Sequence, residues 1–144
     1  MTPLAYPKSK FEPGDVTCLS AEMERERLSP SALKGFFNLT KRWTLKSAVA
    51  RELLGSISRS IFYDWKRSPD RLLSVDKITR ISFLIGIYKA LDGLYGDKLA
   101  DEWVLLPNRN VLFGGHPPLQ YMVLRGLIGM QAVLCLLCAR GAET

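Results

Sequence analysis

The chain has 144 residues, of which 47% are hydrophobic and 24% are charged. These fractions are ordinary for a globular domain and exclude a disordered, collagen-like or disulfide-framework chain. The net charge is +6, and the whole excess falls in residues 41–80, which hold ten Lys or Arg and four Asp or Glu. An excess confined to one segment indicates a surface for a polyanion, usually nucleic acid, or else a solvated basic face.

Residues 1–28 are predicted to form a flexible N-terminal arm. Pro3, Pro7 and Pro13 interrupt it, and residues 21–28 offer only a short exposed helix with alternating charges. The first ten residues lack the apolar run of a secretory signal. Three cysteines, two of them in an apolar stretch, indicate reduced thiols. Both observations favour a cytoplasmic location.

Helical signals begin at Ser29, where a capping serine precedes Pro30 at the first helical position. Thr44 is the expected cap of a second helix over 45–54, which Gly55 would end. The residues from 53 to 58 then form a corner between two helices, as in helix-turn-helix proteins. We therefore predict a DNA-binding region over 29–70.

The third expected helix covers 59–67, after a capping Ser58 and before Pro69. At about 100° per residue, Ile61, Phe62 and Trp65 share one arc, which is expected to face the core. The opposite arc is polar and carries three cations, as a recognition helix requires, although an ordinary amphipathic surface helix shows the same division. The expected DNA-binding residues are Lys46, Arg59, Ser60, Tyr63, Lys66 and Arg67.

The next expected helix, 75–94, is capped by Ser74 and has no charged residue between positions 81 and 88. A helix that is apolar all round lies at a domain centre or against a second copy, so we expect a homodimer or higher oligomer. A short helix over 97–103 and an ordered loop over 106–118 follow.

The last segment, 117–139, is predicted to form two helices with a break near Gly126. No alternation typical of strands persists anywhere, so the predicted fold is all-α. Residues 119–139 contain a single charge, but the interruptions favour a packed helix pair or an interface over a membrane span. We expect no membrane association.

Chemical motifs are weak. Cys135 and Cys138 have metal or redox spacing, but no second pair completes a site and His116 is the only histidine, so buried packing thiols are expected. Asp101 and Glu102 are adjacent on a helix and are expected to form a solvated face rather than an acid–base pair. We predict a protein that is not an enzyme, with no catalytic residue, no metal and no cofactor.

Residues 35–141 resemble the antitoxins of the Xre/MbcA/ParS type, which are partners of RES-domain toxins. The resemblance runs through Trp43, the corner at Gly55 and the run 85–91. Its most specific part is the segment 112–119, Leu-Phe-Gly-Gly-His-Pro-Pro-Leu, followed by Met122.

The resemblance implies an Xre-like N-terminal region that binds operator DNA and a helical C-terminal region, 71–144, that covers the active site of an NAD-consuming toxin. It implies toxin contacts by Phe113, His116, Arg125, Ala139, Arg140 and Gly141. The function expected from it is a type II antitoxin that represses its own operon. The alternative is a stand-alone transcriptional regulator whose C-terminal half only dimerises.

Overall fold

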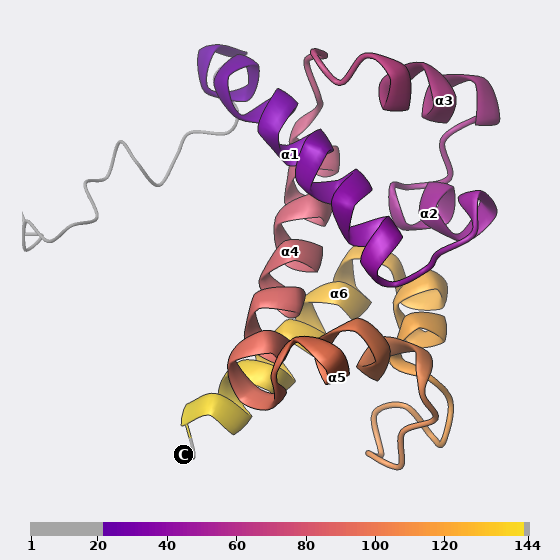
Figure 1. The fold of residues 1–144 in the computed structure, drawn as a ribbon, viewed down its shortest axis with the longest axis vertical. Helices are drawn as coiled ribbons and strands as arrows, with labels where there is room; N and C mark the ends of the chain where they lie inside the picture. Colours follow the sequence, from indigo (N-terminus) through magenta and orange to yellow (C-terminus); the bar gives the residue numbers. More distant parts are fainter. Residues whose placement is uncertain (1–21, 143–144) are drawn as a thin grey trace, which may run out of the picture.

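The computed structural model describes residues 22–142, and every regular element in this range is helical. The expected all-α fold is therefore confirmed (Figure 1). Most of the predicted arm, residues 1–21, lies outside the described residues. The elements are α1 (Glu22–Arg42), α2 (Ser47–Leu53), α3 (Arg59–Arg67), α4 (Val75–Tyr95), α5 (Asp97–Glu102), the 3-10 turn η1 (Trp103–Leu105) and α6 (Pro118–Ala142).

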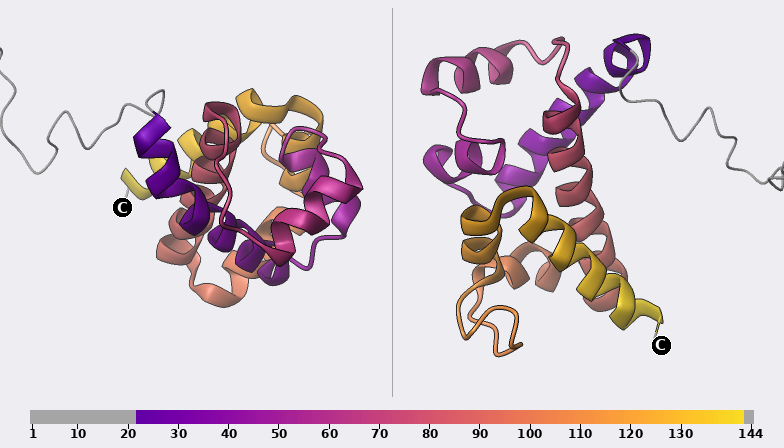
Figure 2. Two further views of the ribbon diagram at one scale, coloured as in Figure 1. Left: turned by 90° about the horizontal axis from the view of Figure 1, so that it is seen from above. Right: turned by 180° about the vertical axis from the view of Figure 1, so that it is seen from behind.

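Helix α4 is the centre of the structure. Helices α1, α5 and α6 all pack against it (Figures 1 and 2). Ile81, Leu84, Ile87 and Leu91 have no exposed surface. The helix that is apolar on all sides is thus covered in large part by the chain's own helices, as expected for a helix at a domain centre.

Helix α1 begins earlier than predicted. Ser29 does not cap it, because α1 runs from Glu22 straight through Pro30. The Ser29 side chain is fully buried; its hydroxyl donates a hydrogen bond to the Arg25 carbonyl oxygen and accepts one from the Leu73 amide, 2.9 Å away. The Ser-Pro pair therefore marks a contact between distant segments rather than a helix start.

Substituting Ser29→Ala tests this contact. The change leaves the buried Leu73 amide without its acceptor, so the free energy of unfolding is expected to fall by about 1–3 kcal/mol. The matched control is Ser31→Ala, which removes an exposed hydroxyl bonded to the Leu28 carbonyl and should change stability by less than about 0.5 kcal/mol. Urea unfolding measures both; equal effects would contradict the assignment.

The start of α2 also differs from the prediction. Thr44 has a positive φ of 51° and belongs to the turn after α1, where its hydroxyl donates to the Trp43 carbonyl at 2.6 Å. The helix starts at Ser47, with Lys46 in the cap position and no side-chain cap. Trp43 in this turn is fully buried, and its indole N–H donates to the Ala100 carbonyl at 3.0 Å, which ties the turn to α5.

The predicted caps of α3 and α4 are confirmed. The Ser58 hydroxyl accepts from the Ile61 amide at 3.1 Å, and the Ser74 hydroxyl accepts from the Lys77 amide at 3.3 Å. Helix α3 ends at Arg67, before Pro69, as expected. Gly96, with φ 89°, separates α4 from α5.

The predicted break in the last segment is confirmed at Gly126, whose φ of 65° and ψ of −141° are not helical. Helix α6 therefore consists of two pieces that run in different directions (Figure 2, right). By length and composition α6 passes for a membrane span, with a mean hydropathy of 2.0 over its most apolar window. The longer piece, 127–142, measures only about 24 Å, short of the ~30 Å hydrocarbon core.

Substituting Gly126→Ala is expected to destabilise the fold by about 1–3 kcal/mol, since this backbone conformation is available almost only to glycine. Gly93 in α4 is the control: a Cβ there meets nothing within 4 Å, so Gly93→Ala should raise stability by up to about 1 kcal/mol. Thermal unfolding monitored by circular dichroism gives both values, and a stabilising Gly126→Ala would refute the break.

The cysteine prediction was wrong. Cys135 and Cys138 are free thiols on the exposed side of α6 rather than buried packing groups. The reason is that the second piece of α6 packs on one side only, through Met130, Val133 and Leu137. No group of three or more metal-ligating side chains occurs within residues 22–142.

Candidate nucleic-acid and partner-binding surfaces

The corner between α2 and α3 is fastened by α4. Gly55 and Ser56 both have positive φ, 91° and 63°, and reverse the chain after α2. The Arg80 guanidinium donates to the Leu53 carbonyl at 3.3 Å and pairs with Asp76 at 3.0 Å. A Cβ on Gly55 would lie 2.9 Å from the Lys77 ammonium nitrogen. The two short helices are therefore held at a defined angle by the start of α4.

Helix α3 is seated by Phe62, which is 3% exposed and packs edge-on against Phe37 of α1 at 5.4 Å between ring centroids. The prediction that Ile61 faces the core was wrong: its side chain is 44% exposed. The buried arc centres on Phe62 rather than on Ile61, so Ile61 lies at its edge. Trp65 is half-buried, as a residue of this arc should be.

The six residues predicted to contact DNA are all exposed. Lys46 precedes α2, and the other five lie on the outer side of α3. The face is not wholly cationic, because Asp64 accepts from Arg67 at 3.4 Å and pairs with Arg71 at 2.8 Å. Arg67 nevertheless keeps 72% of its side chain exposed.

Tyr63 links α3 to α2 at this face. A hydrogen bond with the Ser47 side chain, aided by the charges of Arg59, Lys66 and Arg51, lowers the pKa of Tyr63 against an opposing effect of desolvation. The Arg59 guanidinium carbon lies 6.0 Å from the centre of the Tyr63 ring. Three cations around one phenol concentrate positive potential at the junction of the two helices. Sequence reasoning missed Ser47 and Arg51, although their i, i+4 spacing placed them on one side of α2.

The contact with Ser47 predicts the direction in which the pKa of Tyr63 changes when Ser47 is replaced. Because the Ser47 hydrogen bond lowers the pKa of Tyr63, Ser47→Ala is expected to raise it toward 10. The measurement is phenolate absorbance against pH, taken as the difference between each protein and its Tyr63→Phe counterpart. Ser60→Ala, also exposed on α3, is the control and should leave the midpoint unchanged. A midpoint unmoved by Ser47→Ala would contradict the contact.

The residues expected to bind a toxin fall into two groups. Phe113, His116 and Arg125 come from the 106–117 loop and the first piece of α6, and Ala139 to Gly141 lie at the end of α6. In Figure 1 the loop and the C-terminal end both lie at the end of the molecule opposite α3. His116 and Arg125 are exposed, whereas Arg140 is half-buried and donates to the Tyr95 hydroxyl at 2.9 Å.

Phe113 holds the loop rather than presenting its ring to solvent. It is 4% exposed and packs edge-on between Trp103, at 5.9 Å, and Tyr121, at 5.5 Å. The side-chain oxygens of Asn108 and Asn110 accept from the backbone amides two residues further on, both at 2.9 Å. These contacts explain why an apolar loop is ordered: the buried Phe113 ring fixes its centre, and His116, three residues further on, is exposed.

Asp101 is not the solvated carboxylate that the sequence suggested. It accepts a hydrogen bond from the Tyr88 hydroxyl at 2.9 Å and lies 3.6 Å from the Arg42 guanidinium. Desolvation and this acidic partner raise the pKa of Tyr88. The group joins α1, α4 and α5, which is a structural role.

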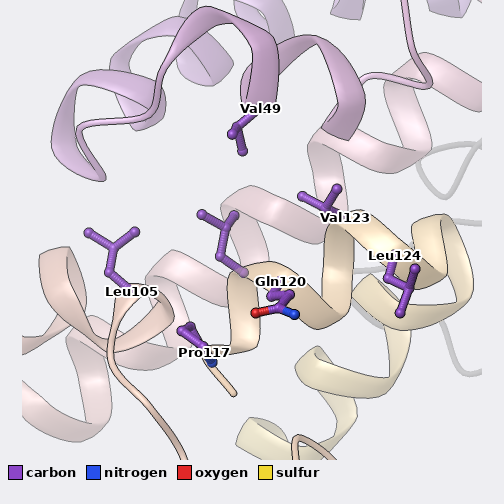
Figure 3. Close-up of a pocket in the computed structure, with 7 residues that line it drawn as sticks. Val49, Leu105, Pro117, Gln120, Val123 and Leu124 are labelled. Atoms are coloured by element: carbon purple, nitrogen blue, oxygen red, sulfur yellow. The ribbon is translucent and has the colours of Figure 1, made fainter.

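An apolar groove of about 420 Å³ lies between α2 and α6. Val49 of α2 and Val123 of α6 lie on opposite sides of it, and Leu105 of η1 closes one side (Figure 3). Leu119 and Leu124 of α6 also line the groove. The groove therefore adjoins both the candidate DNA-binding helices and the piece of α6 that carries Arg125.

No protein-family model matches the chain. A curated relative from Sinorhizobium fredii (strain NBRC 101917 / NGR234), described as uncharacterized protein y4oB, is 38% identical over 80 residues. The matched part covers 55% of this chain and 61% of the relative's own length. The description of this relative names no activity, so the function rests on the surfaces described above.

Proposed function

We propose that the protein is a cytoplasmic antitoxin that binds operator DNA through α3 and neutralises a RES-domain toxin through its opposite end. The observation that carries the DNA-binding half is the outer side of α3, which exposes five polar residues with Tyr63 at their centre. Arg59 and Lys66 of α3 and Arg51 of α2 place three positive charges near the Tyr63 phenol. Arg, Lys, Tyr and Ser are the side chains that commonly contact phosphates and guanine edges.

The position of α3 supports the same proposal. A reading helix must be held rigidly while its outer side stays free. Phe62 anchors α3 to α1, and Arg80 fastens the corner to α4. The outer residues contact one another and their neighbours Ser47 and Asp64, and Tyr63 also packs edge-on against the anchoring Phe62 at 5.2 Å between ring centroids. The outer residues are all exposed, so DNA can reach them without entering the core.

The DNA-binding proposal is tested with two double variants of equal net charge. Arg59→Ala with Lys66→Ala removes two cations from α3, and Lys98→Ala with Arg109→Ala removes two exposed cations elsewhere. If five to seven phosphates are neutralised, log K should fall with log salt at a slope of about −5 to −6. The α3 variant should make that slope less negative by about 2, because two fewer phosphates are neutralised. It should also lose its preference for the operator sequence over other DNA. The control should retain both; identical behaviour of the two variants would reject the assignment.

The toxin-binding half rests on the resemblance of residues 112–119 and on the exposed end of α6. Ala139 and Gly141 are exposed, and the guanidinium of the half-buried Arg140 donates a hydrogen bond to the Tyr95 hydroxyl. Arginine forms bidentate bonds to carboxylates and phosphates, the groups of a nucleotide-binding pocket. The proposal is that this end occludes the toxin's active site.

Truncation after Leu137 tests this half. The truncated chain should still bind DNA, because α3 lies at the other end, but should no longer prevent NAD loss in cells that co-express the RES-domain toxin. Arg140→Glu should act in the same direction, and Lys98→Glu, a charge reversal on α5, is its control. Full protection by the truncated protein would show that the C-terminal end is not the inhibitory element.

The alternative is a stand-alone regulator whose C-terminal half only dimerises. The exposed apolar residues of α6, Leu124 at 79% and Ile128 at 73%, are the observation behind this alternative, because they offer apolar surface to an interface. A RES-domain gene beside the gene for this protein would support the antitoxin, and its absence would support the regulator.

A further inference from the structure

The second piece of α6, residues 127–142, has an open side. Its exposed large or polar positions are Ile128, Gln131, Cys135 and Cys138, which we call the outer stripe. Their spacing of three, four and three residues is that of the a and d positions of paired helices. Met130, Val133 and Leu137 lie on roughly the opposite side of the same helix and are buried in the core.

The outer stripe carries no charge. Two arginines flank it, and each is directed onto its own chain: Arg125 lies 5.9 Å from the Tyr121 ring, and Arg140 donates to the Tyr95 hydroxyl. The excess positive charge of the chain is confined to residues 41–80. A partner recognised by charge would find nothing to bind here, whereas another uncharged helix would.

The order of side-chain sizes along the stripe points to a second copy of this chain. Ile128, the large residue, stands at one end, and the small Cys135 and Cys138 stand at the other. In antiparallel pairing, a positions face d positions. Ile128 then meets Cys138 of the second copy, and Gln131 meets Cys135. Large residues oppose small ones throughout, as close packing requires.

In parallel pairing, large side chains would not lie opposite small ones. It would set Ile128 against Ile128 and two pairs of small cysteines against each other, with a gap at one end of the interface. We propose that the protein forms an antiparallel two-fold dimer through the outer stripe of α6. This proposal goes beyond the antitoxin assignment and needs neither DNA nor toxin.

The dimer is expected to be weak. The helix piece is about 24 Å long, and a specific stable interface takes roughly 800 Å² from each partner. A single helix pair supplies less than this, so dissociation in the micromolar range follows. In this register Ala139 to Gly141 lie beside residues 125–127 of the second copy, at the edge of the pairing.

The first experiment is light scattering coupled to size exclusion, with the full chain at about 10 and 200 μM. The mass is expected to rise toward twice the 16.2 kDa of one chain. Ile128→Glu should give one chain at both concentrations. Val111→Glu is the matched control, since Val111 is 94% exposed in the 106–117 loop, and it should still dimerise. A wild-type protein that stays monomeric at 200 μM, or a control that also dissociates, overturns the proposal.

The second experiment is disulfide cross-linking, which tests the direction of pairing. With Cys18 and Cys135 replaced by Ser, Ile128→Cys is combined with the native Cys138 and, separately, with Cys138→Ser. Antiparallel pairing predicts cross-linked dimers under mild oxidation only when Cys138 is present. Equal cross-linking in both proteins indicates parallel pairing and overturns the register.

A lipid surface is the competing occupant of an uncharged apolar stripe. Sedimentation with phosphatidylcholine vesicles, which have no net charge and so do not attract the basic residues of 41–80, is expected to leave the full chain in the supernatant. Co-sedimentation that Ile128→Glu abolishes would assign the stripe to the membrane instead of to a second copy. None of these variants alters α3 or residues 139–141, so failure here is distinguishable from failure of the DNA or toxin tests.

Discussion

The apolar circumference of α4 is the constraint on which the remaining structure depends. A helix with no charged residue between positions 81 and 88 must bury most of its apolar side chains, so other helices pack around it and leave Ser82 as the exposed position of this run. Helices α1 and α6 pack against α4, and α5, which follows α4 directly in the chain, packs against it as well. Trp43 then joins two of these layers, since its buried indole donates to the Ala100 carbonyl.

The two candidate surfaces follow from this arrangement. Helices α2 and α3 have few residues with which to bury themselves, and they rest on α1 through Phe62 and on α4 through Arg80. Their outer side is consequently free for a ligand. The far end of the molecule carries the pinned loop and the end of α6. The groove beside Val49 is the region where the two parts adjoin each other.

The features that could be predicted from the sequence are those that depend on interactions between residues close together in the chain. The caps at Ser58 and Ser74 depend on amides three residues away, and the break at Gly126 depends on its own backbone. The failures depend on distant contacts. Ser29 bonds to Leu73, 44 residues further on, and the exposure of Cys135 depends on which helices leave that side of α6 uncovered. Periodicity gives the arc of α3 but not its centre, which the contact of Phe62 with α1 determines.

Helices α1 and α4 run in the same direction (Figures 1 and 2), so the chain that joins them must travel back over the length of a helix. Helices α2 and α3 make up this return path, and the Ser29–Leu73 hydrogen bond fastens its far end to α1. Loop closure costs little more when a connection lengthens, roughly 0.6 kcal/mol for each doubling. The exposed turns of this return path can therefore accept insertions at little cost, whereas Leu53, Leu54 and Phe62 within it belong to the core and fix its position on the scaffold.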